Sequence, residues 1–137
     1  MMGMFHADIT KFVNNTKLLT DNVVKEIVSE VAASVVELSP VDTGNFVSNW
    51  LVGIDTAVPW GVTGNKNPDK ESNINRIISR IPVDSSNHNY LIINNTSYGE
   101  KLETGVGMKH PPYAMVGITM VRIPNIVRRV IRSQVTK

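Results

Sequence analysis

The clearest pattern along the chain is an apolar periodicity between Asp8 and Leu38. Apolar residues recur there mostly at spacings of three and four, at Ile9, Phe12, Val13, Val23, Ile27, Val31, Val35 and Leu38. This spacing places them on one helical face and predicts a long amphipathic helix. A break near residues 14–16, or recapping at Thr20 and Asp21, is expected. Because valine has a low helix propensity, packing should hold this helix more than local preference does.

A second helical stripe follows Pro111 and Pro112, which are tolerated in the first turn of a helix. Its apolar positions are Val116, Met120, Ile123, Val127, Val130 and Ile131. Pro124 lies inside the stripe, so we expect a kink or a break into two helices near Ile123.

The region between the two helical stripes predicts two strands and a short helix. Residues 51–58 alternate in part and precede Pro59, which should end a strand there. Residues 90–95 are apolar and β-prone, as in a buried strand. Four isoleucines within residues 73–81 share one helical face: Ile74, Ile77, Ile78 and Ile81. Together these patterns predict an α+β fold, with a long N-terminal helix and a C-terminal helix packed on a small antiparallel sheet.

The length and composition are those of one globular domain. The chain has 137 residues, of which 42% are hydrophobic and 19% charged, so we assign residues 1–137 to a single domain. Residues 59–73 are rich in Gly, Asn, Pro and charge, which predicts a long exposed loop. The absence of cysteine excludes disulfides. No apolar run approaches the roughly 20 residues of a membrane span, so no membrane partner is expected.

The segment SPVDTGNFVSNW, residues 39–50, has an unusually specific composition. Pro40 cannot continue the preceding helix and disfavours helical geometry at the residue before it. Asp42 or Thr43 can cap a new helical turn. The segment therefore predicts a sharp corner after the first helix.

Three further residues indicate that this corner is buried. Gly44 lets the backbone approach another segment closely. Phe46 and Trp50 are four residues apart, which places two aromatic rings on one helical face. These features are typical of a structural anchor, and we assign no catalytic role to them.

VDTGNFVSNW resembles the VDTG-x-aromatic/Leu-x-x-x-Trp signature of the tail-completion and neck proteins of tailed bacteriophages, the gene-product-ten-like family. A second block, YGEKLETGVGMKHPPYAMV at 98–116, is similar to that family's second signature. Its matching positions are Tyr98, Leu102, Glu103, Gly105 and Pro112. The chain departs from the pattern at position 45, an Asn where basic residues are frequent, and residues 57–89 match no signature.

The resemblance implies a structural virion protein at the phage head-to-tail junction, assembled in the host cytoplasm. Such neck or tail-completion subunits form homo-oligomeric rings, commonly sixfold or twelvefold, around a channel for DNA. Their neighbours are portal or adaptor proteins on one side and tail proteins on the other. Tail terminator and head-tail adaptor remain alternatives within this class. A ring needs heterologous interfaces, which residues 59–73 and the uneven charge of the chain are candidates to provide.

Charge is unevenly distributed along the chain. Residues 1–68 hold four lysines or arginines against seven acidic residues, while residues 69–137 hold ten against five. Arg128, Arg129 and Arg132 are candidate contacts for DNA or for an acidic partner surface. They also support an alternative from another class, a small basic nucleic-acid-binding protein.

The sequence predicts no catalytic, cofactor or metal site. It lacks a phosphate-binding glycine loop and an HExxH motif. His6, His88 and His110 are scattered without ligand spacing, so surface or packing roles are expected. Glu100 and Glu103 with His110 offer an acid/base alternative, as a hydrolase would need. We expect Glu103 instead to bond the backbone or a neighbouring subunit.

Overall fold

The computed structural model describes residues 5–57, with the exception of 9–19, together with residue 59 and residues 61–135. The elements in chain order are β1 (Phe5–Asp8), α2 (Asp21–Glu37), the 3₁₀ helix η1 (Val47–Asn49), β2 (Trp50–Ile54), α3 (Lys70–Ile78), the 3₁₀ helix η2 (Ser85–Asn87), β3 (Tyr90–Asn94), α4 (Gly99–Thr104) and α5 (Met115–Val135).

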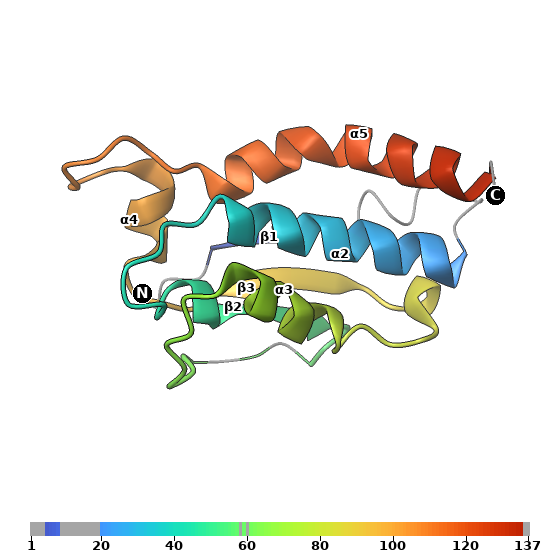
Figure 1. The fold of residues 1–137 in the computed structure, drawn as a ribbon, viewed down its shortest axis with the longest axis horizontal. Helices are drawn as coiled ribbons and strands as arrows, with labels where there is room; N and C mark the ends of the chain where they lie inside the picture. Colours follow the sequence, from blue (N-terminus) through green and yellow to red (C-terminus); the bar gives the residue numbers. More distant parts are fainter. Residues whose placement is uncertain (1–4, 9–19, 58, 60, 136–137) are drawn as a thin grey trace.

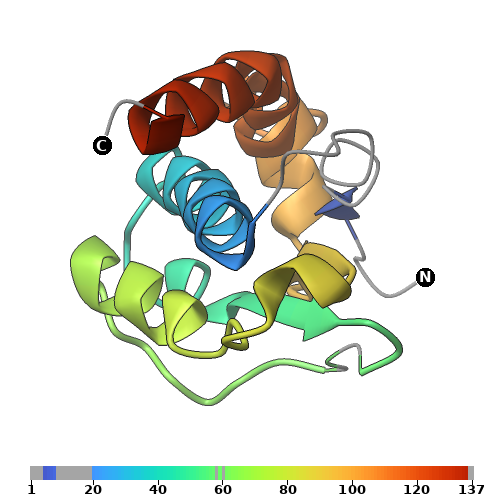
Figure 2. The same cartoon turned by 90° about the vertical axis from the view of Figure 1, so that its right-hand side faces the viewer.

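Helix α2 runs through the middle of the molecule. Figure 1 shows α5 alongside α2 on one side, with the sheet and α3 on the other. Figure 2, nearly along the axis of α2, shows the other elements arranged around it. Because other elements pack against α2 on several sides, tertiary packing can stabilise this helix although its many valines have a low helix propensity.

The sheet has three antiparallel strands in the order β1-β3-β2. In β2 and β3 the side chains alternate between the two faces of the sheet. Trp50 and Val52 therefore share the face of Ile92, and all three belong to the main core. The expected α+β fold, with its two long helices and antiparallel sheet, is confirmed.

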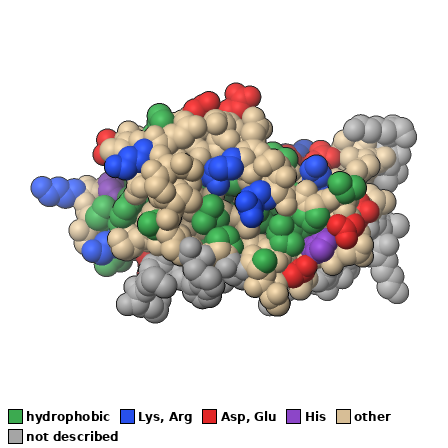
Figure 3. Space-filling model, turned by 90° about the horizontal axis from the view of Figure 1, so that it is seen from below, with side chains coloured by type: hydrophobic (Ala, Val, Ile, Leu, Met, Phe, Trp, Pro, Cys, Tyr) green, Lys and Arg blue, Asp and Glu red, His purple; other side chains and the backbone are tan. Residues whose placement is uncertain are grey.

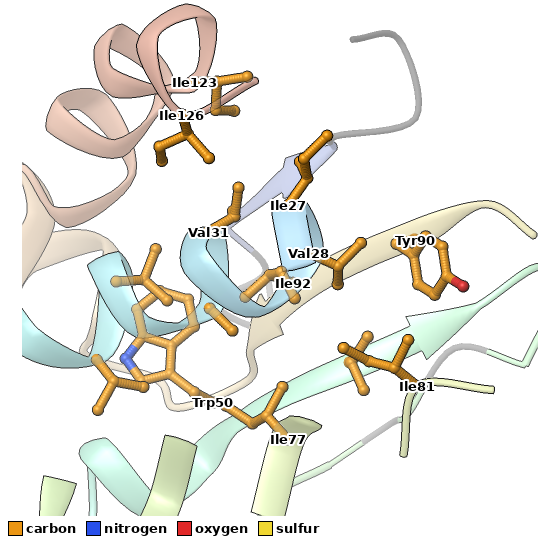
Figure 4. Close-up of a cluster of buried hydrophobic side chains, with 14 of the residues drawn as sticks. Ile27, Val28, Val31, Trp50, Ile77, Ile81, Tyr90, Ile92, Ile123 and Ile126 are labelled. Atoms are coloured by element: carbon orange, nitrogen blue, oxygen red, sulfur yellow. The ribbon is translucent and has the colours of Figure 1, made fainter. Parts of the chain in front are cut away.

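The core joins α2 to both of its neighbours. Ile27, Val28 and Val31 of α2 are fully buried, and Figure 4 shows them between the side chains of α5 and those of the sheet. The α5 side contributes Ile123 and Ile126, and the opposite side contributes Trp50, Ile77, Ile81, Tyr90 and Ile92. Within the described residues, the predicted apolar stripes of both long helices therefore face the core; Ile9, Phe12 and Val13 of the first stripe lie outside the described residues.

The start of α2 confirms the expected recapping. Thr20 is the N-cap residue, and its Oγ1 accepts a hydrogen bond of 3.3 Å from the Val23 N–H. Asp8, in contrast, was expected in the helix and lies in β1, where it pairs with Leu91 of β3. Local periodicity could not reveal this strand, because pairing with β3 supplies its hydrogen bonds. The expected break at residues 14–16 lies outside the described residues.

The strand expected over 51–58 is shorter than predicted. It spans Trp50–Ile54, and the backbone then turns at Asp55, whose φ is +56°. The Asp55 carboxylate accepts a hydrogen bond of 2.9 Å from the Asn89 N–H, next to the start of β3, and this contact supports the turn. The strand expected over 90–95 spans Tyr90–Asn94.

Both ends of α3 differ from the helix expected over 73–81, because α3 spans Lys70–Ile78. Helix α3 begins at Lys70 rather than at residue 73, because Asp69 caps its first turn with a hydrogen bond from the Glu71 N–H. The last four residues of the expected loop 59–73 are therefore helical, while the described residues 61–69 form a mostly exposed loop.

Helix α5 is one continuous helix with Pro124 inside it, so the expected break into two helices is wrong. Pro124 is exposed, and it has no N–H group to donate to the Met120 carbonyl. The helix also begins at Met115, after Pro111 and Pro112 rather than with them. Among the described residues, no helix is long and apolar enough to cross a membrane.

Candidate functional site

The corner after α2 is fixed by a buried hydroxyl. Helix α2 ends at Glu37, and Pro40 follows it as expected. The Ser39 hydroxyl donates to the Val35 carbonyl at 2.6 Å, and the Trp50 indole N–H donates to the Ser39 oxygen at 2.8 Å. Ser39 Oγ also lies 3.3 Å from the Met115 sulfur at the start of α5. One residue thus ties the corner to β2 and to α5.

Neither Asp42 nor Thr43 caps the helical turn that follows, so the expected capping is wrong. Thr43 instead stabilises a turn within the corner, where its Oγ1 accepts a hydrogen bond of 3.2 Å from the Asn45 N–H, while Asp42 is exposed at the surface. The helical turn that follows is the 3₁₀ helix η1, which has Phe46 at its N-cap and no side-chain cap. Trp50 already belongs to strand β2, so the expectation that Phe46 and Trp50 share one helical face is wrong.

Gly44 confirms the expected close approach of two backbones. Its φ is +88°, and a Cβ at this position would lie 2.6 Å from Asn67 C and from Pro68 N. The exposed loop 61–69 therefore folds back onto the corner where only glycine fits.

The two sequence blocks meet in space. Phe46 and Trp50 pack edge to face with ring centroids 5.8 Å apart, and Phe46 lies 5.9 Å from the Tyr98 ring. The Asn45 side-chain N–H donates to the Tyr98 hydroxyl at 2.6 Å. The Asn94 side chain completes the junction by donating to the Phe46 carbonyl at 3.0 Å.

A surface groove of about 230 Å³ lies at this junction. Seven of its eight lining residues are motif positions identified from the sequence: Pro40, Asp42, Thr43, Gly44, Phe46, Tyr98 and Leu102, with Asn45 as the eighth. The structure thus brings the first block and the beginning of the second block to one surface.

Glu103 stabilises the start of α5. One carboxylate oxygen accepts from the Val116 N–H and the other from the Gly117 N–H, both at 2.9 Å. The first N–H groups of a helix have no partner within the helix and favour negative charge. The expectation that Glu103 bonds the backbone is therefore confirmed, and its charge is used for helix capping.

Gly105 and Pro112 hold the connection between α4 and α5. Gly105 ends α4 with a φ of +72°, and a Cβ there would lie 2.9 Å from the Pro112 nitrogen. The backbone beside it is fixed by the Tyr113 N–H, which donates to the Leu102 carbonyl at 3.0 Å. These contacts hold residues 105–112 in a loop that projects from the end of the molecule, as Figure 1 shows.

A buried polar network beside the first block was missed by the sequence reasoning. Ser48 and Asn49 are fully buried. Asn67 N–H donates to Ser48 Oγ at 2.8 Å, and Thr63 N–H donates to Asn49 Oδ1 at 2.7 Å. Arg76 donates to the carbonyls of Ser48 and Trp50 at 3.2 and 3.1 Å. Polar residues between Phe46 and Trp50 were the only sequence signal for this network.

His88 forms a second cluster that sequence spacing did not reveal. Its Nδ1 lies 2.6 Å from Asp55 Oδ2, and its Nε2 lies 3.1 Å from Asp84 Oδ1. The pKa of His88 is raised above 6.5, mainly by the hydrogen bond to Asp55 and to a smaller extent by the hydrogen bond to Asp84. The Asn89 N–H and His88 together lower the pKa of Asp55. In the space-filling view of Figure 3, one histidine side chain at the surface has acidic side chains on either side of it.

The three candidate arginines lie on the C-terminal half of α5. Arg129 forms an ion pair with Glu30 of α2, so part of its charge is neutralised within the chain. Arg128 and Arg132 are exposed. The arrangement is therefore less basic than the sequence suggests.

The acid/base alternative does not come together as a cluster. Glu103 caps α5, and the His110 Nδ1–H donates to the Pro111 carbonyl at 2.7 Å. Within the described residues, no hydrogen bond or ion pair joins His110 to Glu100 or Glu103, and no three potential ligands are grouped to hold a metal ion. The side chain of His6 lies outside what the structure describes.

Comparison of the chain with protein-family models, with curated proteins and with solved structures gave no match.

Proposed function

We propose that this chain is a structural subunit of a phage head-to-tail junction, a neck or tail-completion protein that assembles as a homo-oligomeric ring around the DNA channel. It would act in the virion, after assembly in the host cytoplasm, between portal or adaptor proteins and tail proteins. In this role the chain binds other proteins and carries out no reaction.

The observation that carries the proposal is the contact between the two blocks. Tyr98 meets Asn45 and Phe46 across more than fifty positions of sequence. If each block resembled its family signature only by chance, the two blocks would not be expected to lie in contact. The contact therefore supports the interpretation that the two blocks form one motif. The positions within it are used for turns, packing and helix capping, which suits a structural protein.

The test is assembly with neighbouring neck proteins. The full chain, mixed with purified portal-side and tail-side proteins, is expected to form closed rings that light scattering and electron microscopy detect. Mass spectrometry of purified virions should find the chain there. A chain that stays monomeric in every mixture and is missing from virions would overturn the proposal.

Position in the particle separates the alternatives within the class. Labelled subunits should lie between the portal and the first tail ring for a tail-completion protein, against the portal for an adaptor, and at the end of the tail tube for a terminator. For the nucleic-acid-binding alternative, DNA affinity of the isolated chain would fall steeply with salt. The Arg129–Glu30 pair argues against that alternative, because it removes phosphate-binding charge.

A further inference from the structure

A polar pocket of about 520 Å³ lies between the exposed loop 61–69 and helix α3. Residues 65–68 of the loop line it, together with Ser72, Asn73 and Arg76 of α3. Figure 2 shows this part of the chain passing alongside α3. The volume is within the range of pockets that hold a ligand or a few side chains of a partner.

The pocket is cationic. Lys66 and Arg76 line it, and none of its described lining residues is acidic. Asp69 lies next to the pocket in the chain, but its carboxylate accepts the Glu71 N–H as the cap of α3. Among the described residues, no ion pair includes Lys66 or Arg76. The pocket therefore lacks the negative charge that would balance its own two cations.

The pocket also has hydrogen-bond donors to spare. Arg76 makes three hydrogen bonds, two to backbone carbonyls and one to the Asn73 side chain. Because a guanidinium has five N–H groups, at least two of them have no partner within the described part of the chain. The Ser72 oxygen accepts from the Asn67 amide at 3.1 Å, so its own O–H can still donate. An occupant that brings acceptor oxygens would satisfy these donors.

The surroundings of Arg76 favour an anion in particular. The side chain is partly buried, and its acceptors within the chain are uncharged oxygens. Burial, followed by the like charge of Arg80, lowers the pKa of Arg76. Both effects disfavour the charged guanidinium, and a negative charge in the pocket would offset them.

We propose that this pocket binds a carboxylate side chain from an acidic segment of a partner protein, held between Lys66 and Arg76 with the Ser72 hydroxyl as a third donor. A carboxylate supplies the charge and the acceptor oxygens that the pocket lacks. DNA fits less well, because DNA binding neutralises several successive phosphates, whereas this pocket holds two cations in one place. The inference stands on the pocket alone and does not depend on ring assembly.

Nuclear magnetic resonance titration of the full chain tests the site with an end-blocked peptide that carries a run of glutamates. The amide signals of residues 65–67, Ser72 and Asn73 and the Arg76 Nε–H signal are expected to shift and to saturate. The same peptide with glutamine in place of each glutamate should leave them unchanged. Absence of saturable shifts at these signals with the glutamate peptide overturns the proposal.

Charge reversal provides a second readout. Lys66→Glu should weaken binding of the glutamate peptide about tenfold, because like charges then meet in the pocket. The fold should be kept, since the Lys66 side chain is exposed; circular dichroism checks this.

The matched control is Lys25→Glu, which makes the same change in net charge at an exposed position of α2 outside the pocket. Its affinity for the peptide should stay within about twofold of the unmodified chain, because salt screens distant charges. Equal losses in the two variants would mean that net charge alone attracts the peptide, and would overturn the site.

Double-stranded DNA, added at the same total charge as the glutamate peptide, is the competing occupant. We expect it to shift the pocket signals less than the peptide does. Stronger shifts with DNA would identify the pocket as a phosphate site and overturn the assignment to a protein partner.

Discussion

At the scale of the residue, most motif positions have a local physical reason for their identity. Gly44 is glycine because the backbone of residues 67 and 68 occupies the place of a side chain. Ser39 is a hydroxyl because it receives the Trp50 indole N–H in a buried site. Each requirement can be tested by changing one atom group.

Gly44→Ala should destabilise the chain by about 3–4 kcal/mol, from a left-handed backbone penalty plus a steric clash. Gly61 is the matched control: its φ is +77°, but a Cβ there would meet nothing within 4 Å. Gly61→Ala should therefore cost only about 1–2 kcal/mol. Urea unfolding of both variants measures the difference, and equal losses would contradict the close approach at Gly44.

His88 should make stability depend on pH. Because its folded pKa is raised above 6.5, the folded state holds the proton more tightly than the unfolded chain. The stability that protonated His88 contributes is complete below pH 6.5, and it is lost as the pH rises through the raised pKa of the folded state. Asp55, with its pKa lowered from 3.8, contributes above that pH and loses its contribution as the pH falls through the folded pKa.

We expect His88→Asn to be least stable, relative to the unmodified chain, at pH values between the folded-state pKa of Asp55 and that of His88. The difference in stability between the two proteins should become smaller in alkaline solution. Chemical unfolding across pH measures it, and NMR titration of the His88 ring gives the pKa itself. In Asp84→Asn the ring should titrate at a lower pH, since one raising interaction is removed; an unchanged titration would count against the cluster.

At the scale of the element, α5 depends on a charge from α4. The helix has its first N–H groups satisfied by Glu103, which is thirteen and fourteen positions away from the donors. This contact stabilises the first turn of α5, which begins at Met115.

Glu103→Gln should cost about 1 kcal/mol of stability, because the amide keeps the shape but loses the negative charge and one acceptor oxygen. In the same variant, the amide protons of Val116 and Gly117 should exchange with solvent faster, because they lose a charged acceptor. Glu100→Gln serves as the control, since Glu100 is exposed on the same helix, and should change stability by less than about 0.5 kcal/mol. Unaltered exchange in Glu103→Gln would mean that the cap is dispensable.

At the scale of the whole molecule, one core connects α2 to α5, α3 and the sheet. Such a core should unfold as a unit, so tryptophan fluorescence and far-ultraviolet circular dichroism should report the same transition. Ile27→Ala should lower stability by about 2–5 kcal/mol without separating the two probes. Ile118→Ala, at a side chain that is 37% exposed, should cost much less. Two resolved transitions would argue against a single core.

The amino-acid sequence by itself determined the features that depend on local chemistry. The helical stripes, the stop at Pro40, the recapping at Thr20 and the turn conformation at Gly105 follow from side-chain periodicity and from what proline, threonine and glycine allow. For the same reason the corner at 39–50 could be recognised as structural before any contact was known.

Only the tertiary structure decided the features that depend on distant partners. Strand β1 exists because β3 supplies its hydrogen bonds, and the His88 cluster exists because the antiparallel pairing of β2 with β3 brings Asp55 to His88. The contact of Asn45 with Tyr98 likewise joins segments that are unrelated in local pattern. Periodicity describes which face of an element is buried, but it does not specify what covers that face.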